Sequence, residues 1–216
     1  NHIVLLYSDG SSISLGANSK GQLGIGSTSD INQFNPVSSD EKFNYVSCGE
    51  DFTLWISKSG LLYAAGVNNY NKPTSLNAIQ CSAYKNVASV ITENKTVLFW
   101  PDFHKFDQYK EYTLINPAKE ISCGVDFVSV LLENQTLFRI YSNGNVEPII
   151  VQTSPESTND RFIQASSCES YTVAIDFNSN LWLIGQVGRL KSSQSLPPLC
   201  TDVANVFALP QSIVTV

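Results

Sequence analysis

Few side chains in this sequence could support acid–base or nucleophilic chemistry. The chain has two histidines, His2 and His104. His2 stands where later segments place Phe, Val or Tyr, which favours a core or edge position, and a general-base role for His104 in Phe103–Asp107 is the less favoured alternative. The motifs of zinc hydrolases, serine hydrolases, P-loops and dinucleotide sites are absent. We therefore predict no catalytic residue, no metal, no cofactor and no enzymatic activity.

The cysteines indicate a reducing environment. There are five, and none belongs to a Cys-x-x-Cys pair: Cys48, Cys81, Cys123, Cys168 and Cys200. An odd number without paired spacing fits reduced thiols better than a disulfide framework. We expect them to act as small buried apolar side chains, and we expect a cytoplasmic protein, with a nuclear location as the alternative.

A glycine-rich stretch, Gly16–Gly26, could in principle hold an anion, since backbone N–H groups of glycine loops bind phosphate. It lacks the Gly-Lys-Ser/Thr ending of a P-loop, and no helical pattern follows it. The residues before it, Ile3–Tyr7, Asp9-Gly10 and Ile13–Leu15, have the pattern of a strand, a turn and a second strand. We therefore interpret the stretch as a connection between strands.

The same frame recurs along the chain. A shift of fifty residues places Gly10 on Gly60 and Gly16 on Gly66. Equivalent positions then recur about every forty residues, at His2, Phe52, Val87, Phe127, Tyr171 and Ser212. A period near forty, with strand-like alternation, is typical of β-propellers built from four-stranded blades. The predicted repeat units are 2–51, 52–86, 87–126, 127–170 and 171–211, with a closing strand at 212–216.

The first two units resemble the RCC1 repeat (regulator of chromosome condensation). The resemblance is carried by Val46-Ser47-Cys48-Gly49-Glu50-Asp51-Phe52-Thr53, by Leu61-Leu62-Tyr63-Ala64-Ala65-Gly66 and by the Gly16–Gly26 stretch. It is strong over residues 1–71 and degenerate afterwards. It implies an all-β propeller of RCC1-like repeats. The glycines that carry the repeat are Gly10, Gly16, Gly21, Gly24, Gly26, Gly60 and Gly66.

The chain of 216 residues is expected to form one propeller domain, residues 1–216. The run Ser212–Val216 has the same repeat phase as His2–Leu6, so the two termini could complete one blade together and remove unpaired edges. We therefore favour a ring of about five blades closed through the termini. The alternative is a fragment of a seven-bladed ring, the number usual for proteins that the repeat resembles.

The charge pattern lowers the expectation of a nucleic-acid partner. Charged residues make up 15% of the chain, the formal net charge is −6, and lysines and arginines are scattered. No apolar run approaches the length of about 18 residues that spans a bilayer. We expect a monomer that does not insert into membranes and that binds another protein.

Loops are then the candidate functional surface. The segment between residues 103 and 112 mixes aromatic and charged side chains, as protein contact sites do. The candidate contact residues are Phe103, Lys105, Phe106, Tyr109 and Tyr112; packing over their own blade is the equal alternative. The resemblance implies a non-catalytic interaction platform that is a regulatory domain of a larger signalling protein linked to small GTPases. Its partner would be a small GTPase or a domain of the same protein. The alternative is a guanine-nucleotide exchange factor for a Ran- or Rho-type GTPase.

Overall fold

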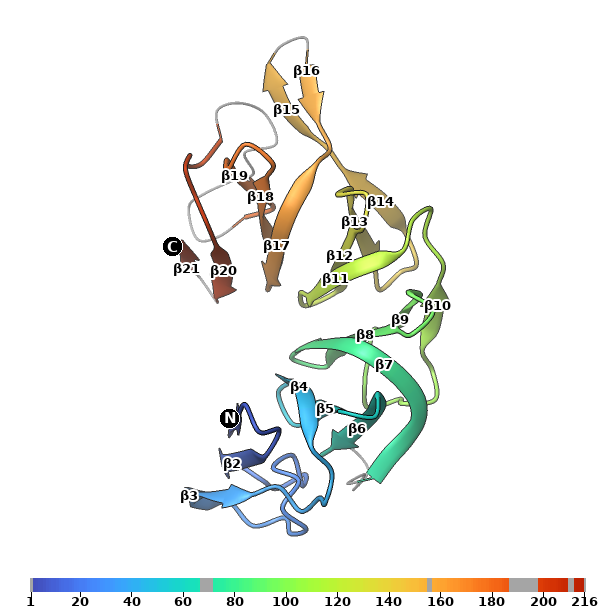
Figure 1. The fold of residues 1–216 in the computed structure, drawn as a ribbon, viewed down its shortest axis with the longest axis vertical. Coiled ribbons are helices and arrows are strands. Elements are labelled where there is room, and N and C mark those ends of the chain that lie inside the picture. The colour runs from blue at the N-terminus through green and yellow to red at the C-terminus, as the bar shows by residue number, and fades with distance from the viewer. Residues whose placement is uncertain (1, 67–71, 155–156, 187–197, 210–211, 216) are drawn as a thin grey trace. The chain divides into compact units, whose positions relative to one another are not determined.

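The computed structural model describes residues 2–66, 72–154, 157–186, 198–209 and 212–215. Every regular element in these ranges is a β-strand (Figure 1). The chain divides into two compact units, Asn1–Glu111 and Tyr112–Val216. We call them the N-terminal and C-terminal units and describe each by itself. The prediction of an all-β fold is confirmed, and the single domain of residues 1–216 stays a prediction.

The N-terminal unit begins with a three-stranded antiparallel sheet, the first blade. It consists of β1 (His2–Leu6), β2 (Ser12–Gly16) and β3 (Ile31–Pro36). Strands β1 and β2 form a hairpin in which His2 pairs with Gly16 and Leu6 with Ser12. The glycine-rich stretch lies between β2 and β3, so it connects two neighbouring strands, as the sequence predicted.

The rest of this unit is a continuous sheet of seven strands that contains two blades. The strands are β4 (Phe43–Cys48), β5 (Thr53–Ser57), β6 (Leu61–Ala65), β7 (Lys72–Tyr84), β8 (Val87–Thr92), β9 (Val97–Trp100) and β10 (Lys110–Tyr112). Strand β7 belongs to both blades: its first part pairs with β6, and from Ala78 onward it pairs with β8. In Figure 1 it is the long, strongly curved arrow. The second blade is therefore β4 to the start of β7, and the third is the end of β7 to β10.

The C-terminal unit repeats this plan. The fourth blade is β11 (Ala118–Cys123), β12 (Phe127–Leu132), β13 (Leu137–Tyr141) and β14 (Val146–Ile149). The fifth contains β17 (Phe162–Cys168), β18 (Tyr171–Asp176) and β19 (Leu181–Ile184). Two further antiparallel pairs are β15 (Val151–Ser154) with β16 (Ser157–Asn159), and β20 (Val206–Leu209) with β21 (Ser212–Thr215).

One hairpin turn recurs in all five blades, between the strands that follow the repeat's anchor. In each, a residue with positive φ donates its N–H to the carbonyl three residues before it, and these residues are Gly10, Gly60, Lys95, Gln135 and Ser179. Glycine adopts this conformation without steric cost, whereas other residues are strained in it. The three degenerate repeats therefore keep the turn although they have lost its glycine.

In the second to fifth blades, the second strand is buried on both faces, which explains its continuous apolar runs. All residues of β5, β12 and β18 are buried, and so are five of the six residues of β8. A strand that is buried on both faces has no face on which polar residues are favoured, so alternation with polar residues is lost. The tryptophans Trp55, Trp100 and Trp182 lie among these strands, each at most 1% exposed.

Each end of the chain pairs within its own unit. Among the described residues, β21 pairs with β20, and β1 pairs with β2. Closure of the ring through the two termini stays a prediction. The number of blades stays a prediction.

Candidate functional site

Phe103, the first residue of the predicted contact segment, lies inside the N-terminal unit. Its side chain is 2% exposed. Its ring stacks on Phe52 with 4.3 Å between centroids and meets the edge of Trp100 at 5.6 Å. It belongs to the apolar core shared by the second and third blades. A partner therefore has no access to Phe103, and for this residue the packing alternative describes the structure.

The other aromatic residues of the segment cover the same core. The half-buried Phe106 stacks on Trp100 at 5.7 Å, and the Trp100 indole Nε1–H donates to the Phe106 carbonyl at 2.6 Å. Tyr109, 39% exposed, lies 5.1 Å from Trp100. Tyr112 is half-buried, and burial raises its pKa. Of the five candidate contact residues, the exposed ones are therefore Lys105 and Tyr109.

His104 is held between two carboxylates. Its Nδ1 lies 3.0 Å from Asp102 Oδ1 and its Nε2 lies 3.1 Å from Asp51 Oδ2. Ionised carboxylates only accept hydrogen bonds, so both ring nitrogens must donate, which only the imidazolium can do. Burial lowers the pKa of His104, but the hydrogen bonds and the charges of Asp51 and Asp102 outweigh it and raise the pKa overall. This arrangement suits an electrostatic clamp on the segment and does not suit a general base.

The electrostatic clamp formed by His104, Asp51 and Asp102 has an exposed and a buried side. Lys105 Nζ lies 3.5 Å from Asp102 Oδ2, with the lysine side chain 60% exposed. Burial raises the pKa of Asp102, but the hydrogen bonds from His104 and the nearby charges outweigh it and lower the pKa overall. Asp51 Oδ1 is buried and has no hydrogen-bond partner among the described residues. Oδ2 is therefore the oxygen through which the Asp51 carboxylate contacts His104.

His2 links the edge of the first blade to the second blade. Its Nε2 lies 2.7 Å from Thr53 Oγ1, whose own hydroxyl donates to the Gln22 carbonyl at 2.8 Å. Thr53 therefore accepts from His2, which assigns the proton to Nε2. Burial and the charge of the chain terminus lower the pKa of His2. The ring therefore links β1 to β5.

The glycine stretch uses its backbone N–H groups internally. Gly21 and Gly24 donate to the carbonyls of Asn18 and Gly21, and Leu23 donates to the Asn18 side chain at 3.0 Å. The Asn18 amide also donates to the carbonyls of Ser27 and Ser29. All seven glycines predicted to carry the repeat have positive φ: Gly10, Gly16, Gly21, Gly24, Gly26, Gly60 and Gly66.

Asn18 is fully buried and was not among the residues predicted to carry the repeat. The fifty-residue shift that places Gly16 on Gly66 also places Asn18 on Asn68. Asn68 lies outside the described residues.

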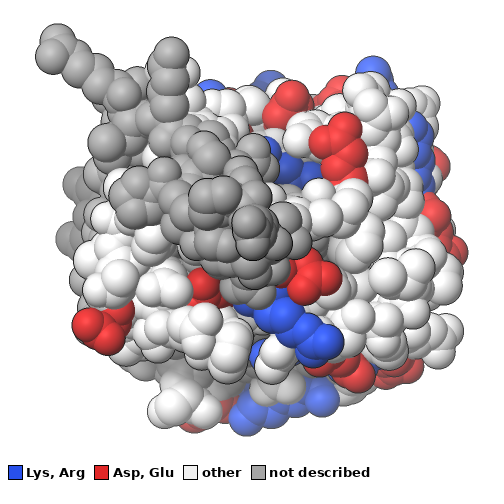
Figure 2. Space-filling model, turned by 90° about the horizontal axis from the view of Figure 1, so that it is seen from above, with Lys and Arg blue, Asp and Glu red and all other residues white. Residues whose placement is uncertain are grey.

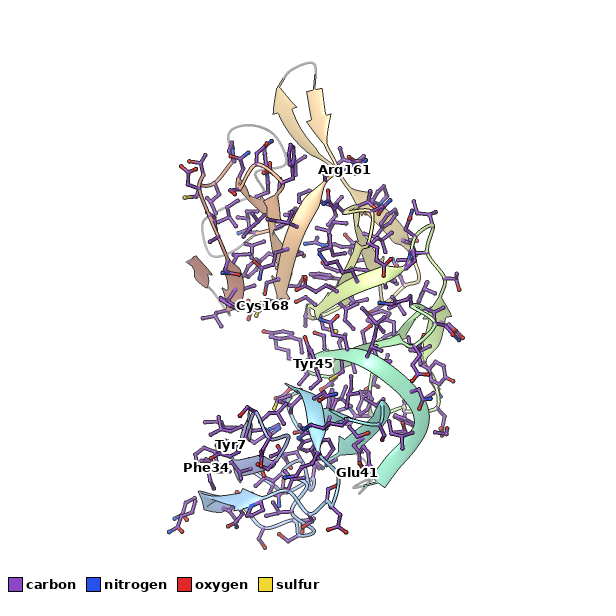
Figure 3. The ribbon with its side chains drawn as sticks, viewed as in Figure 1. Tyr7, Phe34, Glu41, Tyr45, Arg161 and Cys168 are labelled. Atoms are coloured by element: carbon purple, nitrogen blue, oxygen red, sulfur yellow. The ribbon has the colours of Figure 1, made fainter. Side chains whose placement is uncertain are left out.

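Other aromatic side chains of the N-terminal unit are also exposed, and two of them, Tyr7 and Phe34, are more exposed than Tyr109. Figure 3 labels Tyr7, Phe34 and Tyr45, which are 50, 42 and 37% exposed. Beside Tyr7 lies an open depression of about 330 Å³, which Asp9 and Ser11 also line. The two hydrogen bonds from Ser11 lower the pKa of Asp9 to about 2, so it is ionised in neutral solution. Sequence reasoning missed these residues because strand positions do not show which face lacks a neighbour.

Charges and metal-binding side chains are dispersed in the part of the chain that the structure describes. On the face in Figure 2, acidic and basic side chains are interspersed. Within the described ranges, no three His, Cys, Asp or Glu side chains are grouped so that they could hold a metal ion. A search of the same ranges found no helix long and apolar enough to cross a membrane.

The sequence matches known proteins over part of its length. Residues 9–56 match the family described as "Regulator of chromosome condensation (RCC1) repeat". The X-linked retinitis pigmentosa GTPase regulator of Canis lupus familiaris is 29% identical over 121 residues, 47% of this chain and 12% of the relative. The secretion-regulating guanine nucleotide exchange factor of Bos taurus is 32% identical over 73 residues, 33% of this chain and 16% of the relative. The matched segments are thus small parts of both relatives.

Solved structures extend the likeness of the fold over the whole chain. Human WBSCR16 superimposes with a TM-score of 0.78 at 17% identity, covering 100% of this chain and 69% of that one. Yeast RCC1 (Prp20), solved bound to Kap60, superimposes with a TM-score of 0.74 at 12% identity, covering 99% and 63%. The chain therefore carries an RCC1-like repeat and has the fold of the RCC1-like β-propellers.

Proposed function

We propose that this chain is a non-catalytic protein-interaction platform that takes part in the regulation of a small GTPase. The observation that carries the proposal is the RCC1 repeat at residues 9–56, together with the names of the two relatives, one a GTPase regulator and the other a guanine nucleotide exchange factor. The chain matches only a small part of each relative, so the partner has to be identified by experiment.

The surface supports contact better than chemistry. The His104 ring is bonded to two carboxylates. Its neighbours Lys105 and Tyr109 are exposed on a segment that a buried aromatic layer holds in place. An exposed cation and an aromatic ring on a fixed backbone are typical parts of a protein-binding surface. The five free cysteines support a reducing compartment, and we propose the cytoplasm.

Nucleotide exchange is the second candidate. It is favoured by the 32% identity to a protein named as an exchange factor. Exchange requires no covalent chemistry from the propeller, because it needs only a group that displaces the bound nucleotide. An interaction platform and an exchange factor therefore differ in their effect on the rate at which the GTPase releases its nucleotide.

The test measures binding and nucleotide release together. A panel of small GTPases, Ran and Rho types included, is loaded with a fluorescent GDP analogue and mixed with the 216-residue chain. We expect binding of at least one GTPase with an unchanged release rate. Faster release at substoichiometric amounts of the chain would make it an exchange factor. Absence of binding to every GTPase of the panel would overturn the link to GTPases.

Two variants locate the contact. Lys105→Glu combined with Tyr109→Ala changes the exposed part of the segment and leaves Phe103 and Phe106 in place. Lys20→Glu, at an exposed position of the glycine stretch, is the control for the same change of charge. We expect the double variant to lose at least about tenfold in affinity, the size of one well-placed side-chain contact. Equal affinities of the double variant and the control would place the contact elsewhere, with Tyr7 and Phe34 as the next positions to test.

A further inference from the structure

Arg139 is a buried cation at a position where the other blades place small or apolar residues. In the strand register, Arg139 pairs with Ser129 of β12. The residues equivalent to Arg139 in the other blades are Ser14, Ala64, Phe99 and Leu183. Its side chain is 7% exposed. Tyr141, two residues later, stands where three of the other blades have glycine: Gly16, Gly66 and Gly185. The fourth blade thus departs from the repeat at two neighbouring positions.

The hydrogen bonds of Arg139 go to neutral acceptors. Nε and Nη2 donate to Thr172 Oγ1 at 3.2 and 2.7 Å, and Nη2 also donates to the Ile184 carbonyl at 2.8 Å. The Phe127 ring lies 4.3 Å from the guanidinium carbon. These contacts use three of the five N–H groups, and the Tyr141 hydroxyl can take one more. At least one N–H is therefore available, and within the described residues no carboxylate lies within ion-pairing distance.

A cavity of about 300 Å³ adjoins this side chain. Its lining includes Arg139, Tyr141, Glu147, Ile184 and Gly185, all within the C-terminal unit. Glu147 faces Arg139 across β13 and β14, but it is exposed and forms no ion pair with it. The guanidinium is held toward Thr172 and Ile184, so the two opposite charges lie at the cavity without meeting. Burial without a paired anion is costly for a guanidinium.

We propose that this cavity binds a single carboxylate group, presented by the acidic side chain of a protein partner, with the guanidinium of Arg139 as its counter-charge. The guanidinium suits this role because its planar donors match a carboxylate. A dianionic phosphate suits the site less, since there is one cation and Glu147 adds a negative charge at the same cavity. The site does not depend on the partner's being a GTPase, so its failure and that of the proposed function are distinguishable.

The test observes Arg139 directly by NMR. The chain has three arginines, Arg139, Arg161 and Arg189, so the three Nε–H signals can be assigned with single Arg→Lys variants. The 216-residue chain is titrated with a capped peptide that carries one Glu, with the same peptide carrying Gln, with free glutarate, and with inorganic phosphate, all at constant ionic strength. We expect the Glu peptide to shift the Arg139 signal with saturation, while the exposed Arg161 stays unchanged.

Charge variants sharpen the result. Glu147→Gln removes the competing carboxylate and should tighten binding of the Glu peptide about tenfold, because two negative charges at the same cavity repel each other. Arg139→Lys keeps the charge but loses the planar fork, and should weaken binding.

Other outcomes decide against the proposal. An unchanged Arg139 signal with the Glu peptide overturns it, and so does weaker peptide binding in Glu147→Gln. Saturation by phosphate or by free glutarate at lower concentration than by the peptide overturns the assignment to a protein side chain.

Discussion

Two connections of the N-terminal unit occupy the same place in their blades and are built in opposite ways. The first connection, Gly16–Gly26, follows β2, the strand of the first blade that is equivalent to β9 in the third blade. There, backbone hydrogen bonds and one buried amide, Asn18, hold a tight loop together. The second, residues 101–109, follows the equivalent strand β9. There, two phenylalanines pack on Trp100, and His104 is clamped by carboxylates.

The difference shows what stabilises this connection in a repeat that has lost its glycines. Where glycine allows the backbone to approach closely, the loop needs little side-chain volume. Pro101 stands at the glycine position in the third blade, and apolar side chains then fill the space. The same place in the fold can therefore be stabilised by backbone hydrogen bonds or by hydrophobic burial. The four predictions below test this comparison.

The largest effect is expected from Phe103→Ala. It removes a ring that is 2% exposed and leaves a cavity between Phe52 and Trp100. We expect a loss of about 3–5 kcal/mol in the free energy of unfolding, measured by urea denaturation. Tyr109→Ala, in the same segment but 39% exposed, is the matched control and should cost far less. Equal losses would mean that the segment is not held by its buried ring.

Asn18→Ala tests the corresponding support of the glycine loop. The substitution removes one accepted and two donated side-chain hydrogen bonds and leaves the Leu23 N–H and two carbonyls without this partner. We expect a loss of about 2–3 kcal/mol in the free energy of unfolding. Asn44→Ala, at an exposed position of β4, is the control and should be nearly neutral. A neutral Asn18→Ala would show that the backbone alone maintains the loop.

Gly24→Ala compared with Gly21→Ala separates backbone strain from close packing. Both glycines have positive φ, 65° and 83°, so both substitutions incur strain of about 1–2 kcal/mol. A Cβ at Gly24 would lie 3.1 Å from Trp55 and 3.3 Å from Val37, whereas one at Gly21 has no neighbour within 4 Å. Gly24→Ala should therefore be the more destabilising by about 1 kcal/mol in thermal or urea unfolding. A larger loss for Gly21→Ala would contradict this packing.

The smallest effect is expected in the pH dependence of the free energy of unfolding. The pKa of His104 is raised in the folded chain, so its contribution to stability is complete below the unfolded value near 6.5 and is lost as the pH rises through the folded value. The pKa of His2 is lowered, so His2 acts on the acid side of 6.5, where stability falls as the pH decreases from the unfolded value toward the folded value. Since His104 is 36% exposed, solvent screening keeps its contribution below about 1 kcal/mol.

The pH experiment measures the free energy of unfolding between pH 5.5 and 8.5. Relative to the wild type, His104→Gln should lose stability at the acid end and little at the alkaline end. An equal loss at both ends would mean that the imidazolium charge has no role in holding the segment.

The sequence predicted the fold well and the surface poorly. Spaced glycines and anchors near every forty residues indicated the hairpins, and the glycine loop lies between strands as expected. The aromatic content of residues 103–112 indicated a contact, but Phe103 is core and Phe106 is half-buried. Composition cannot separate these cases, because aromatic side chains are common in both cores and interfaces. Burial depends on which blade lies over a segment.

The amino-acid pattern alone determined the repeat, its hairpins and the buried central strands, because these follow from local turn geometry and from apolar runs. The tertiary structure decided the rest. It placed His104 between Asp51 and Asp102, and it placed Arg139 against Thr172 and the Ile184 carbonyl. Asp102 is a close neighbour of His104 in the sequence, but the contacts of His104 with Asp51 and of Arg139 with Thr172 and Ile184 join residues more than thirty positions apart in different blades. Sequence spacing carries no information on such contacts, since they form only when neighbouring blades pack face to face.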